Sequence, residues 1–336
     1  MTDVESIVAD VRARGDEAVR EWAVRLDGVE PRRAEPAGEL PVAALLELAD
    51  AVRAWHERQR PADVRLEVRP GVELERRWVP LDSVGIYVPR GLVTTLVMCA
   101  VPAQVAGVER IVVATPPAGA GLVAAAAEIL CLDEVCALGG PQAIAWLAYV
   151  RRVARVVGPG NAYVNEAKLL VSRDVAIDLP AGPSEVVVLA GAGADRRIAE
   201  LELAAQAEHG PGSSCRIVVA DGDLEAALAE VEALAPEHLV LLGDDAEALA
   251  PRVRNAGAVF VGRFAPVAAG DYATGGNHVL PTGGWARSVG GLGLETFLKP
   301  VTVQRVTAAG LAAMRPVVEA LAAVEGMPAH AEAVRR

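Results

Sequence analysis

The sequence predicts an α/β fold with two doubly wound, Rossmann-like units, a helical N-terminal segment and a C-terminal arm. Short apolar runs alternate with amphipathic stretches over residues 84–261, which is the pattern of parallel strands joined by crossover helices. The alternation pauses between residues 179 and 185, so the strands fall into two sets. Residues 1–60 and 308–336 have helical patterns outside these sets.

The first unit is expected between residues 84 and 179, where each apolar strand precedes a stretch with the period of a helix. The expected strands are 84–88, 110–114, 134–138, 154–157 and 175–179, and the expected helices are 94–108, 121–130, 142–151 and 162–171.

The second unit begins with the apolar run Val186–Leu189 and a helix over 196–208 that Gly210 and Pro211 end. Its other strands are expected over 216–220, 238–242 and 258–261, and its other helices over 224–234 and 245–255. From residue 262 to 293 the chain is rich in Gly, Pro, Thr and Asn. A long irregular segment of this kind is usually functional.

The composition indicates a globular protein that acts on a small molecule. Of the 336 residues, 52% are hydrophobic and 23% are charged. The formal net charge of -12 argues against nucleic acid and anionic membranes as partners, because both require a basic face. The sequence shows no secretory signal and no apolar run that could span a membrane, so we expect a cytoplasmic location. Four cysteines, which we expect to be reduced and buried, are Cys99, Cys131, Cys136 and Cys215.

Polar residues with the spacing of metal ligands end one predicted helix. Gln206 and His209 lie three residues apart, so both side chains point the same way. This spacing suits a metal, although a histidine at a helix C-terminus also complements the helix dipole. Glu237 and His238 are adjacent, so we expect their side chains to diverge and to be able to serve two proton transfers.

Three further polar positions admit simple structural roles. His278 could be a turn residue, Asp271 could form an Asx-turn, and His56 is expected on a solvated helical face.

Two glycine segments could bind phosphate. Residues 158–161, with the sequence Gly-Pro-Gly-Asn, follow a strand and precede a helix, so free N–H groups could face an anion. Asn161 could equally be a plain N-cap. Residues 191–194 resemble the start of a dinucleotide fingerprint, but Arg196 replaces its third glycine and a turn is favoured.

Eight motifs follow one another along the chain. They are Val84-Gly-Ile-Tyr-Val-Pro89, Gly139-Gly-Pro-Gln-Ala-Ile144, Val157-Gly-Pro-Gly-Asn-Ala-Tyr-Val164, Ala181-Gly-Pro-Ser-Glu185, Gln206-Ala-Glu-His-Gly210, Pro236-Glu-His-Leu239, Gly270-Asp-Tyr-Ala273 and Asn277-His-Val-Leu-Pro-Thr282. Their order resembles that of the signature blocks of the histidinol dehydrogenase family. Residues 10–17 and 325–330 fit as well, so the resemblance covers essentially the whole chain.

The resemblance implies two cofactors, Zn2+ and NAD, and a homodimer with shared active sites. The implied zinc ligands are Gln206, His209, Asp271 and, from the partner subunit, His330. Two imidazoles, a carboxylate and an amide suit zinc. The implied catalytic bases are Glu237 and His238. The implied NAD contacts are Tyr87, Gln142 and Asn161. The implied substrate contacts are Ser184, Gln206, His209, His238, Asp271, His278, Glu325 and His330.

The implied reaction is the four-electron oxidation of L-histidinol to L-histidine through histidinal with two NAD, in histidine biosynthesis. His238 would take the alcohol proton, and Glu237 would activate water to hydrate the aldehyde. The chain departs from the family by a shorter segment between Val219 and Pro236, and by Arg90 and Pro141 where smaller residues are usual. The altered Arg90 loop leaves an alternative open, a related zinc and NAD dehydrogenase of another amino alcohol or diol.

Four parts are expected along the chain. They are an N-terminal helical segment, 1–20; a first α/β domain with most metal and base residues, 21–86 plus 186–295; a second α/β domain on the cofactor side, 87–185; and a C-terminal dimerisation arm, 296–336.

Overall fold

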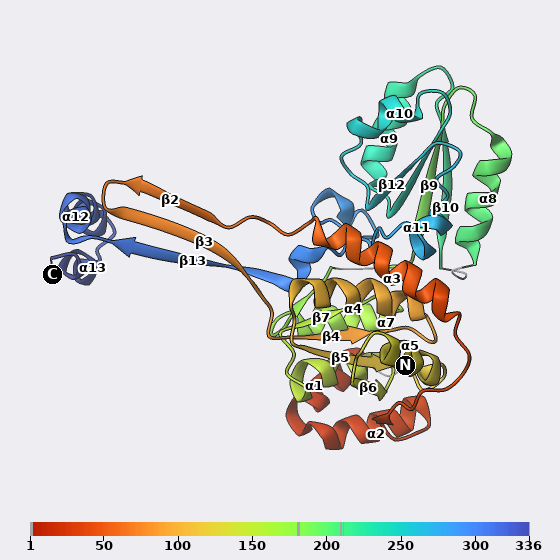
Figure 1. Ribbon diagram of the computed structural model, residues 1–336, viewed down its shortest axis with the longest axis horizontal. Helices are drawn as coiled ribbons and strands as arrows, with labels where there is room; N and C mark the ends of the chain where they lie inside the picture. The colour runs from red at the N-terminus through yellow and green to blue at the C-terminus, as the bar shows by residue number, and fades with distance from the viewer. Residues whose placement is uncertain (1–2, 180–181, 209, 211, 336) are drawn as a thin grey trace. The chain divides into compact units, whose positions relative to one another are not determined.

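A computed structural model describes residues 3–179, 182–208, 210 and 212–335 of the protein. The chain forms two compact units (Figure 1). Unit 1 consists of Met1–Gln59 and Leu81–Phe297, and unit 2 consists of Arg60–Pro80 and Leu298–Arg336.

Unit 1 contains a sheet with Rossmann-like strand order. In the described part of the chain this sheet has six strands, ordered β1-β6-β5-β4-β7-β8. They are β1 (Arg32–Arg33), β4 (Ser83–Tyr87), β5 (Arg110–Thr115), β6 (Glu134–Ala137), β7 (Arg155–Val157) and β8 (Ala176–Ile177). All neighbours are parallel except β1, which pairs antiparallel with β6 at the edge. The order reverses between β4 and β7, and ligands of such sheets bind where loops diverge at this point.

Helices cover this sheet and bury its apolar strands. They are α4 (Val93–Ala106), α5 (Ala120–Ile129), α6 (Gly140–Ala145) with a π-helical turn (Trp146–Val150), and α7 (Ala162–Val171). The N-terminal helices α1 (Val4–Arg14) and α2 (Asp16–Asp27) pack against α6, and α3 (Val42–Glu57) packs against α4. The predicted first unit is confirmed, with helix and strand ends shifted by a few residues.

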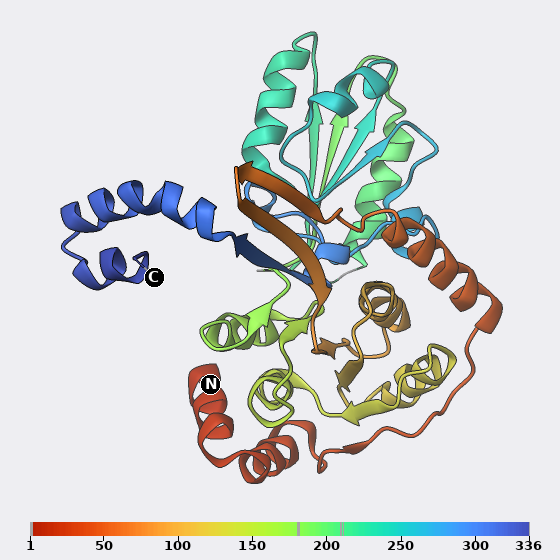
Figure 2. The same ribbon diagram turned by 60° about the vertical axis from the view of Figure 1, so that its left-hand side comes forward.

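The second sheet of unit 1 is entirely parallel. Its four strands in the described ranges are ordered β10-β9-β11-β12. They are β9 (Glu185–Ala190), β10 (Ser214–Val219), β11 (His238–Leu242) and β12 (Ala258–Val261). Alternate residues of each strand point to opposite faces: Val187 and Leu239 pack with α9 (Leu224–Leu234), whereas Val186 and Val240 pack with α8 (Arg196–Ala207). Figure 2 shows these helices on opposite faces of the sheet.

Two short elements differ from the expectation for their segments. The expected helix 245–255 is only α10 (Ala246–Leu249) and a 3-10 turn (Ala250–Arg252). The segment 262–293, expected to be irregular, contains the helix α11 (Val267–Tyr272). Six residues that follow a proline and include Gly270 are too few to give a helical period, so the sequence pattern did not reveal α11.

Unit 2 is an antiparallel sheet joined to two helices. Its three strands in the described residues are β2 (Val64–Arg69), β3 (Val72–Pro80) and β13 (Leu298–Val306), ordered β13-β3-β2. The helices are α12 (Ala308–Val324) and α13 (Pro328–Ala333). The C-terminal helices agree with the prediction, but the sequence analysis assigned no strands here. Alternating apolar and charged residues over 64–69 were the available signal.

Several expectations about single residues are corrected. His56 is fully buried rather than solvated, because α3 packs against α4, and burial lowers the pKa of its imidazole. All four cysteines are free, but Cys131 and Cys215 are exposed at a helix end and on the edge strand β10. No helix in the described ranges is both long enough and apolar enough to cross a membrane.

The strand pairings also bear on the expected parts of the chain. Strands β1 and β4 both belong to the six-stranded sheet, and β2 and β3 belong to unit 2. The expected division instead joined residues 21–86 to 186–295. As a division into domains, the four expected parts stay a prediction.

Candidate active site

A cavity of about 770 Å³ in unit 1 gathers most of the predicted site residues. Its walls include the loops after β4 and β7 and residues at the amino ends of β9 and β11. Ser184, Gln206, Glu237, His238, Asp271, His278 and Asn161 all line it. Residues far apart in sequence therefore meet at one place, as in a typical enzyme site.

A chain of hydrogen bonds connects three of these side chains. Gln206 Nε2 donates to Ser184 Oγ (2.7 Å), and Ser184 Oγ donates to Glu237 Oε2 (2.7 Å). The backbone N–H of Glu185 also donates to Glu237 Oε2 (2.8 Å). Glu237 is 7% exposed. Two donors on one oxygen fix the carboxylate in its rotamer.

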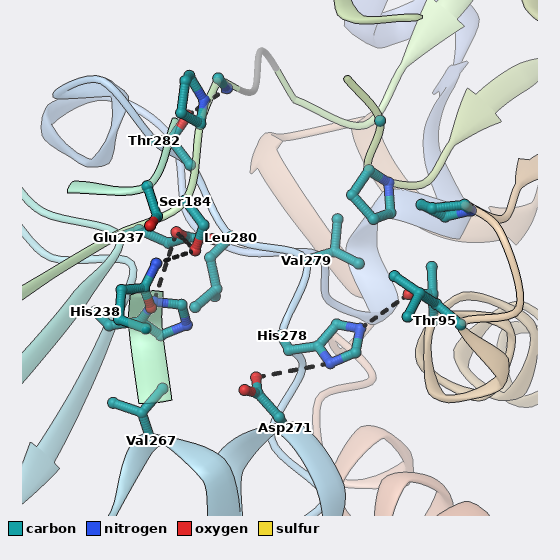
Figure 3. A pocket seen from close by; sticks show the side chains of 18 of the residues that line it. Thr95, Ser184, Glu237, His238, Val267, Asp271, His278, Val279, Leu280 and Thr282 are labelled. Carbon is teal, nitrogen blue, oxygen red and sulfur yellow. Dashed lines mark hydrogen bonds and ion pairs between the residues drawn. The ribbon is translucent and has the colours of Figure 1, made fainter. Parts of the chain in front are cut away.

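His238 is positioned beside this carboxylate (Figure 3). Its Nδ1 lies 3.1 Å from the carbonyl oxygen of Glu185 and 3.5 Å from Glu237 Oε2. Both neighbours are acceptors, so we assign the proton of the neutral ring to Nδ1, which leaves Nε2 able to accept a proton. The expected divergence of the two side chains is wrong, because Glu237 precedes the first residue of β11 and is not part of the strand.

His278 lies between Asp271 and Thr95 (Figure 3). Its Nδ1 is 3.8 Å from Asp271 Oδ1, and its Nε2 is 3.4 Å from Thr95 Oγ1. Asp271 belongs to α11, so the Asx-turn suggested for it is wrong. Asn277 forms the local turn instead, since its Oδ1 accepts from Val279 N (3.0 Å).

Glu202 is a buried carboxylate of the cavity that the sequence analysis missed. It lies one helical turn before Gln206 on α8, so the i, i+4 spacing was a usable signal. Its Oε2 accepts from the backbone N–H of Val267 (3.1 Å). Burial raises the pKa of Glu202, the Val267 N–H opposes this shift, and the charge of Asp271 adds to it.

The predicted metal ligands are distributed over both units. Gln206 and Asp271 line the cavity, His209 lies outside the described residues, and His330 belongs to α13 of unit 2, as Glu325 belongs to the end of α12. Among the described residues no three His, Cys, Asp or Glu side chains form a metal site. An amide and a carboxylate in one cavity nonetheless fit part of a zinc donor set.

The predicted cofactor residues lie at the carboxyl ends of the strands of the six-stranded sheet. Tyr87 ends β4; its hydroxyl accepts from Gly140 N (3.3 Å), and burial raises its pKa to about 12. Gln142 is fully buried and donates from Nε2 to Asp27 Oδ2 (3.2 Å), while its Oε1 has no hydrogen-bond partner among the described residues. A buried acceptor without a partner fits a ligand that donates to it.

Asn161 has the N-cap role considered for it, and its contact with a cofactor stays a prediction. Its Oδ1 accepts from Val164 N (3.0 Å), so it is the N-cap of α7, and the residue also lines the cavity. Asp27 was not predicted, although its Oδ2 holds both Gln142 and the N–H of Gly139 (2.9 Å).

The fold and the site define an α/β enzyme with a Rossmann-like sheet and a carboxylate–imidazole pair in its cavity. The family model described as histidinol dehydrogenase matches residues 1–230 and 215–336. The chain therefore belongs to the histidinol dehydrogenase family.

Individual relatives agree with the family match. A histidinol dehydrogenase of Cereibacter sphaeroides is 42% identical, with 99% of this chain and 90% of the relative covered. A histidinol dehydrogenase of Methanosarcina mazei is 38% identical, again with 99% of this chain and 90% of the relative covered. The crystal structure of histidinol dehydrogenase from Elizabethkingia anophelis superimposes with a TM-score of 0.90 at 29% identity, and covers 99% of this chain and 92% of that chain.

The comparisons also locate a shortened segment. The alignment with the Methanosarcina mazei relative runs over 392 positions, more than the 336 residues of this chain. The two matches to the family model meet at residues 215–230. This agrees with the shortening expected between Val219 and Pro236, next to the edge strand β10.

Proposed function

We propose that the protein oxidises L-histidinol to L-histidine through histidinal, with two NAD, in histidine biosynthesis. The observation that supports this most is the hydrogen-bonded group of Gln206, Ser184 and Glu237, with His238 beside it, in one cavity of a chain from this family. Growth rescue of a histidine auxotroph tests the substrate. A dehydrogenase of another amino alcohol or diol would fail to rescue.

Two bound groups would supply chemistry that side chains lack. NAD would accept hydride, and zinc would hold the imidazole and amine of the substrate in place. We assign the metal to Gln206, His209, Asp271 and His330 of the partner subunit, and the cofactor to Tyr87, Gln142 and Asn161.

The side chains of the site perform the proton transfers. In the first oxidation, Nε2 of His238 takes the hydroxyl proton of histidinol as hydride leaves the same carbon, and histidinal forms. Glu237 then takes a proton from water, whose oxygen adds to the aldehyde carbon, and His238 returns its proton to the aldehyde oxygen, so that the hydrate forms. In the second oxidation His238 takes a hydroxyl proton of the hydrate while hydride leaves. The carboxylic acid that forms releases its proton to solvent, which gives the carboxylate of histidine.

Ser184 and Glu185 keep Glu237 in place for this role. The carboxylate accepts from both the hydroxyl and the backbone N–H, so it is oriented before water arrives. We assign Ser184, His278 and Glu325 to substrate binding. The cytoplasmic location stays a prediction.

Removal of the metal is expected to abolish activity and to leave the fold intact. Unit 1 has extensive apolar cores of its own, and a catalytic metal on such a scaffold is not needed for folding. We expect one divalent ion per site, preferably zinc, in metal analysis. Thermal unfolding followed by circular dichroism should stay cooperative after chelation. Full activity in metal-free, chelated protein would contradict the ligand assignment.

Unit 2 supports the proposal of a homodimer through its exposed apolar side chains. On β2, Val64, Leu66 and Val68 are 56%, 58% and 46% exposed, and on α12 Leu321 and Val324 are 60% and 86% exposed. Monomeric proteins seldom expose several apolar side chains along one strand or helix. A second copy of the arm is the partner we propose, with His330 of each chain reaching the site of the other.

Mixing two inactive variants should restore activity if sites are shared. His330→Ala and Gln206→Ala chains are each expected to be inactive, whereas each mixed dimer holds one intact site. After complete exchange at equal amounts, about a quarter of wild-type activity should return. No recovery in re-equilibrated dimers, or an active wild-type monomer in light scattering, would contradict the shared site.

A further inference from the structure

A fully buried ion pair lies beneath the loop that contains Asn161. Lys168 of α7 and Asp178, which follows β8, are 2% and 0% exposed at their side chains, and Lys168 Nζ lies 2.5 Å from Asp178 Oδ1. Burying two charges is costly, and apolar residues of similar volume are often at least as stable. Neither residue takes part in the proposed proton transfers.

The two charged groups hold both polar groups of one backbone residue. Lys168 Nζ donates to the carbonyl oxygen of Gly158 (2.8 Å), and the N–H of Gly158 donates to Asp178 Oδ2 (2.7 Å). Asp178 Oδ1 also accepts from Leu179 N (2.7 Å). The ion pair thus fixes the backbone of Gly158, the first residue after β7, through hydrogen bonds to both of its polar groups.

The backbone conformation of Gly158 would be strained if any other residue stood at this position. Its φ is +108°, and a Cβ atom there would lie 2.2 Å from the carbonyl oxygen of Tyr87. The chain must therefore pass close to the end of β4 in a left-handed conformation, which only glycine adopts at low cost. Two charge-assisted hydrogen bonds on Gly158 stabilise this path.

The rest of the loop is held by α7 and faces the cavity. Asn165 Nδ2 donates to the carbonyl oxygen of Gly160 (2.9 Å), and Asn161 caps the helix. Pro159, Gly160 and Asn161 line the cavity. The loop follows β7, next to β4, where the strand order of the sheet reverses and nucleotides bind in such folds.

We propose that Lys168 and Asp178 are positioning residues for NAD, which act by fixing the loop 158–161. The proposal rests on the proposed role of this loop in cofactor binding. An apolar pair would fill the same volume but would leave both polar groups of Gly158 without these partners, so the loop would lose its fixed position. Loss of a fixed position in a binding loop lowers the affinity for the ligand more than it lowers the stability of the fold.

The test uses the metal-loaded enzyme with Lys168→Met and with the double variant Lys168→Met/Asp178→Leu. In the double variant neither Lys168 nor Asp178 is left as a buried charge without the other, so it is expected to fold even if the single variant does not. In both we expect KM for NAD to rise about tenfold or more, with KM for L-histidinol changed less than about twofold. Zinc content should match that of the wild type.

Leu147→Ala is the matched control for destabilisation. Leu147 is fully buried in the π-helical turn after α6, where it packs against Gly85 of β4 and shares a core cluster with Val153. Its truncation should lower the unfolding temperature and leave KM for NAD unchanged. A folded double variant with wild-type KM for NAD, or an equal rise in the Leu147→Ala control, would overturn the proposal.

Direct binding separates this proposal from the proposed function. NAD is titrated into each protein without substrate, with tryptophan fluorescence as the signal. Wild-type protein that binds no NAD would refute the proposed function. Wild-type binding together with equally tight binding by the double variant would refute only the positioning role.

Discussion

Glu237→Gln is expected to leave oxidation of L-histidinol to histidinal nearly intact and to slow oxidation of histidinal by about 100-fold or more. The amide of glutamine can still accept from Ser184 and from the N–H of Glu185, which now meet at Glu237 Oε2. It cannot take a proton from water. Assays that start from the alcohol and from the aldehyde separate the two steps.

Glu232→Gln is the control for this substitution. Glu232 also accepts a backbone N–H, that of Arg254 (2.7 Å), but does not line the cavity. We expect both oxidations to stay at wild-type rates in this variant. If Glu237→Gln slowed the two oxidations equally, the division of labour between Glu237 and His238 would be wrong.

His238→Asn is expected to slow both oxidations, by about 100- to 10,000-fold each. An asparagine amide can donate to the carbonyl of Glu185, as Nδ1 does at 3.1 Å, but it offers no base in place of Nε2. Turnover with each substrate, measured at saturating NAD, checks this. Loss of only one of the two steps would contradict a shared base.

His56→Asn serves as the matched control for loss of a buried imidazole. His56 is fully buried, and its Nδ1 lies 2.7 Å from the carbonyl oxygen of Val52 within α3. The substitution should lower the unfolding temperature. Turnover per folded molecule should remain that of the wild type, because His56 is not among the residues that line the cavity.

The parallel sheets could be predicted because their strands are buried on both faces. A short, continuous apolar run such as Val186–Leu189 is typical of a strand that helices cover on both sides. The hairpin of β2 and β3 was not recognised, although residues 64–69 alternate apolar and charged side chains, because the apolar side chains of β2 are exposed in one chain. Its stabilising partner is proposed to be a second copy, which one sequence does not reveal.

The types of site residues could be predicted, but their contacts could not. The sequence placed Glu237 next to His238, yet Ser184 meets Glu237 only because β11 pairs with β9 in a register that sets His238 opposite Val186. Register depends on side-chain packing across the sheet. The carboxylate of Glu202 was missed for a similar reason, since its partner Val267 belongs to a helix too short to predict.

The stoichiometry of NADH formed per L-histidinol consumed tests the central claim most directly. With limiting L-histidinol and excess NAD, the proposed mechanism predicts two NADH for each substrate molecule, with L-histidine as the product. One NADH with accumulation of histidinal would contradict the four-electron reaction. No NADH from zinc-loaded protein would contradict the proposed substrate itself.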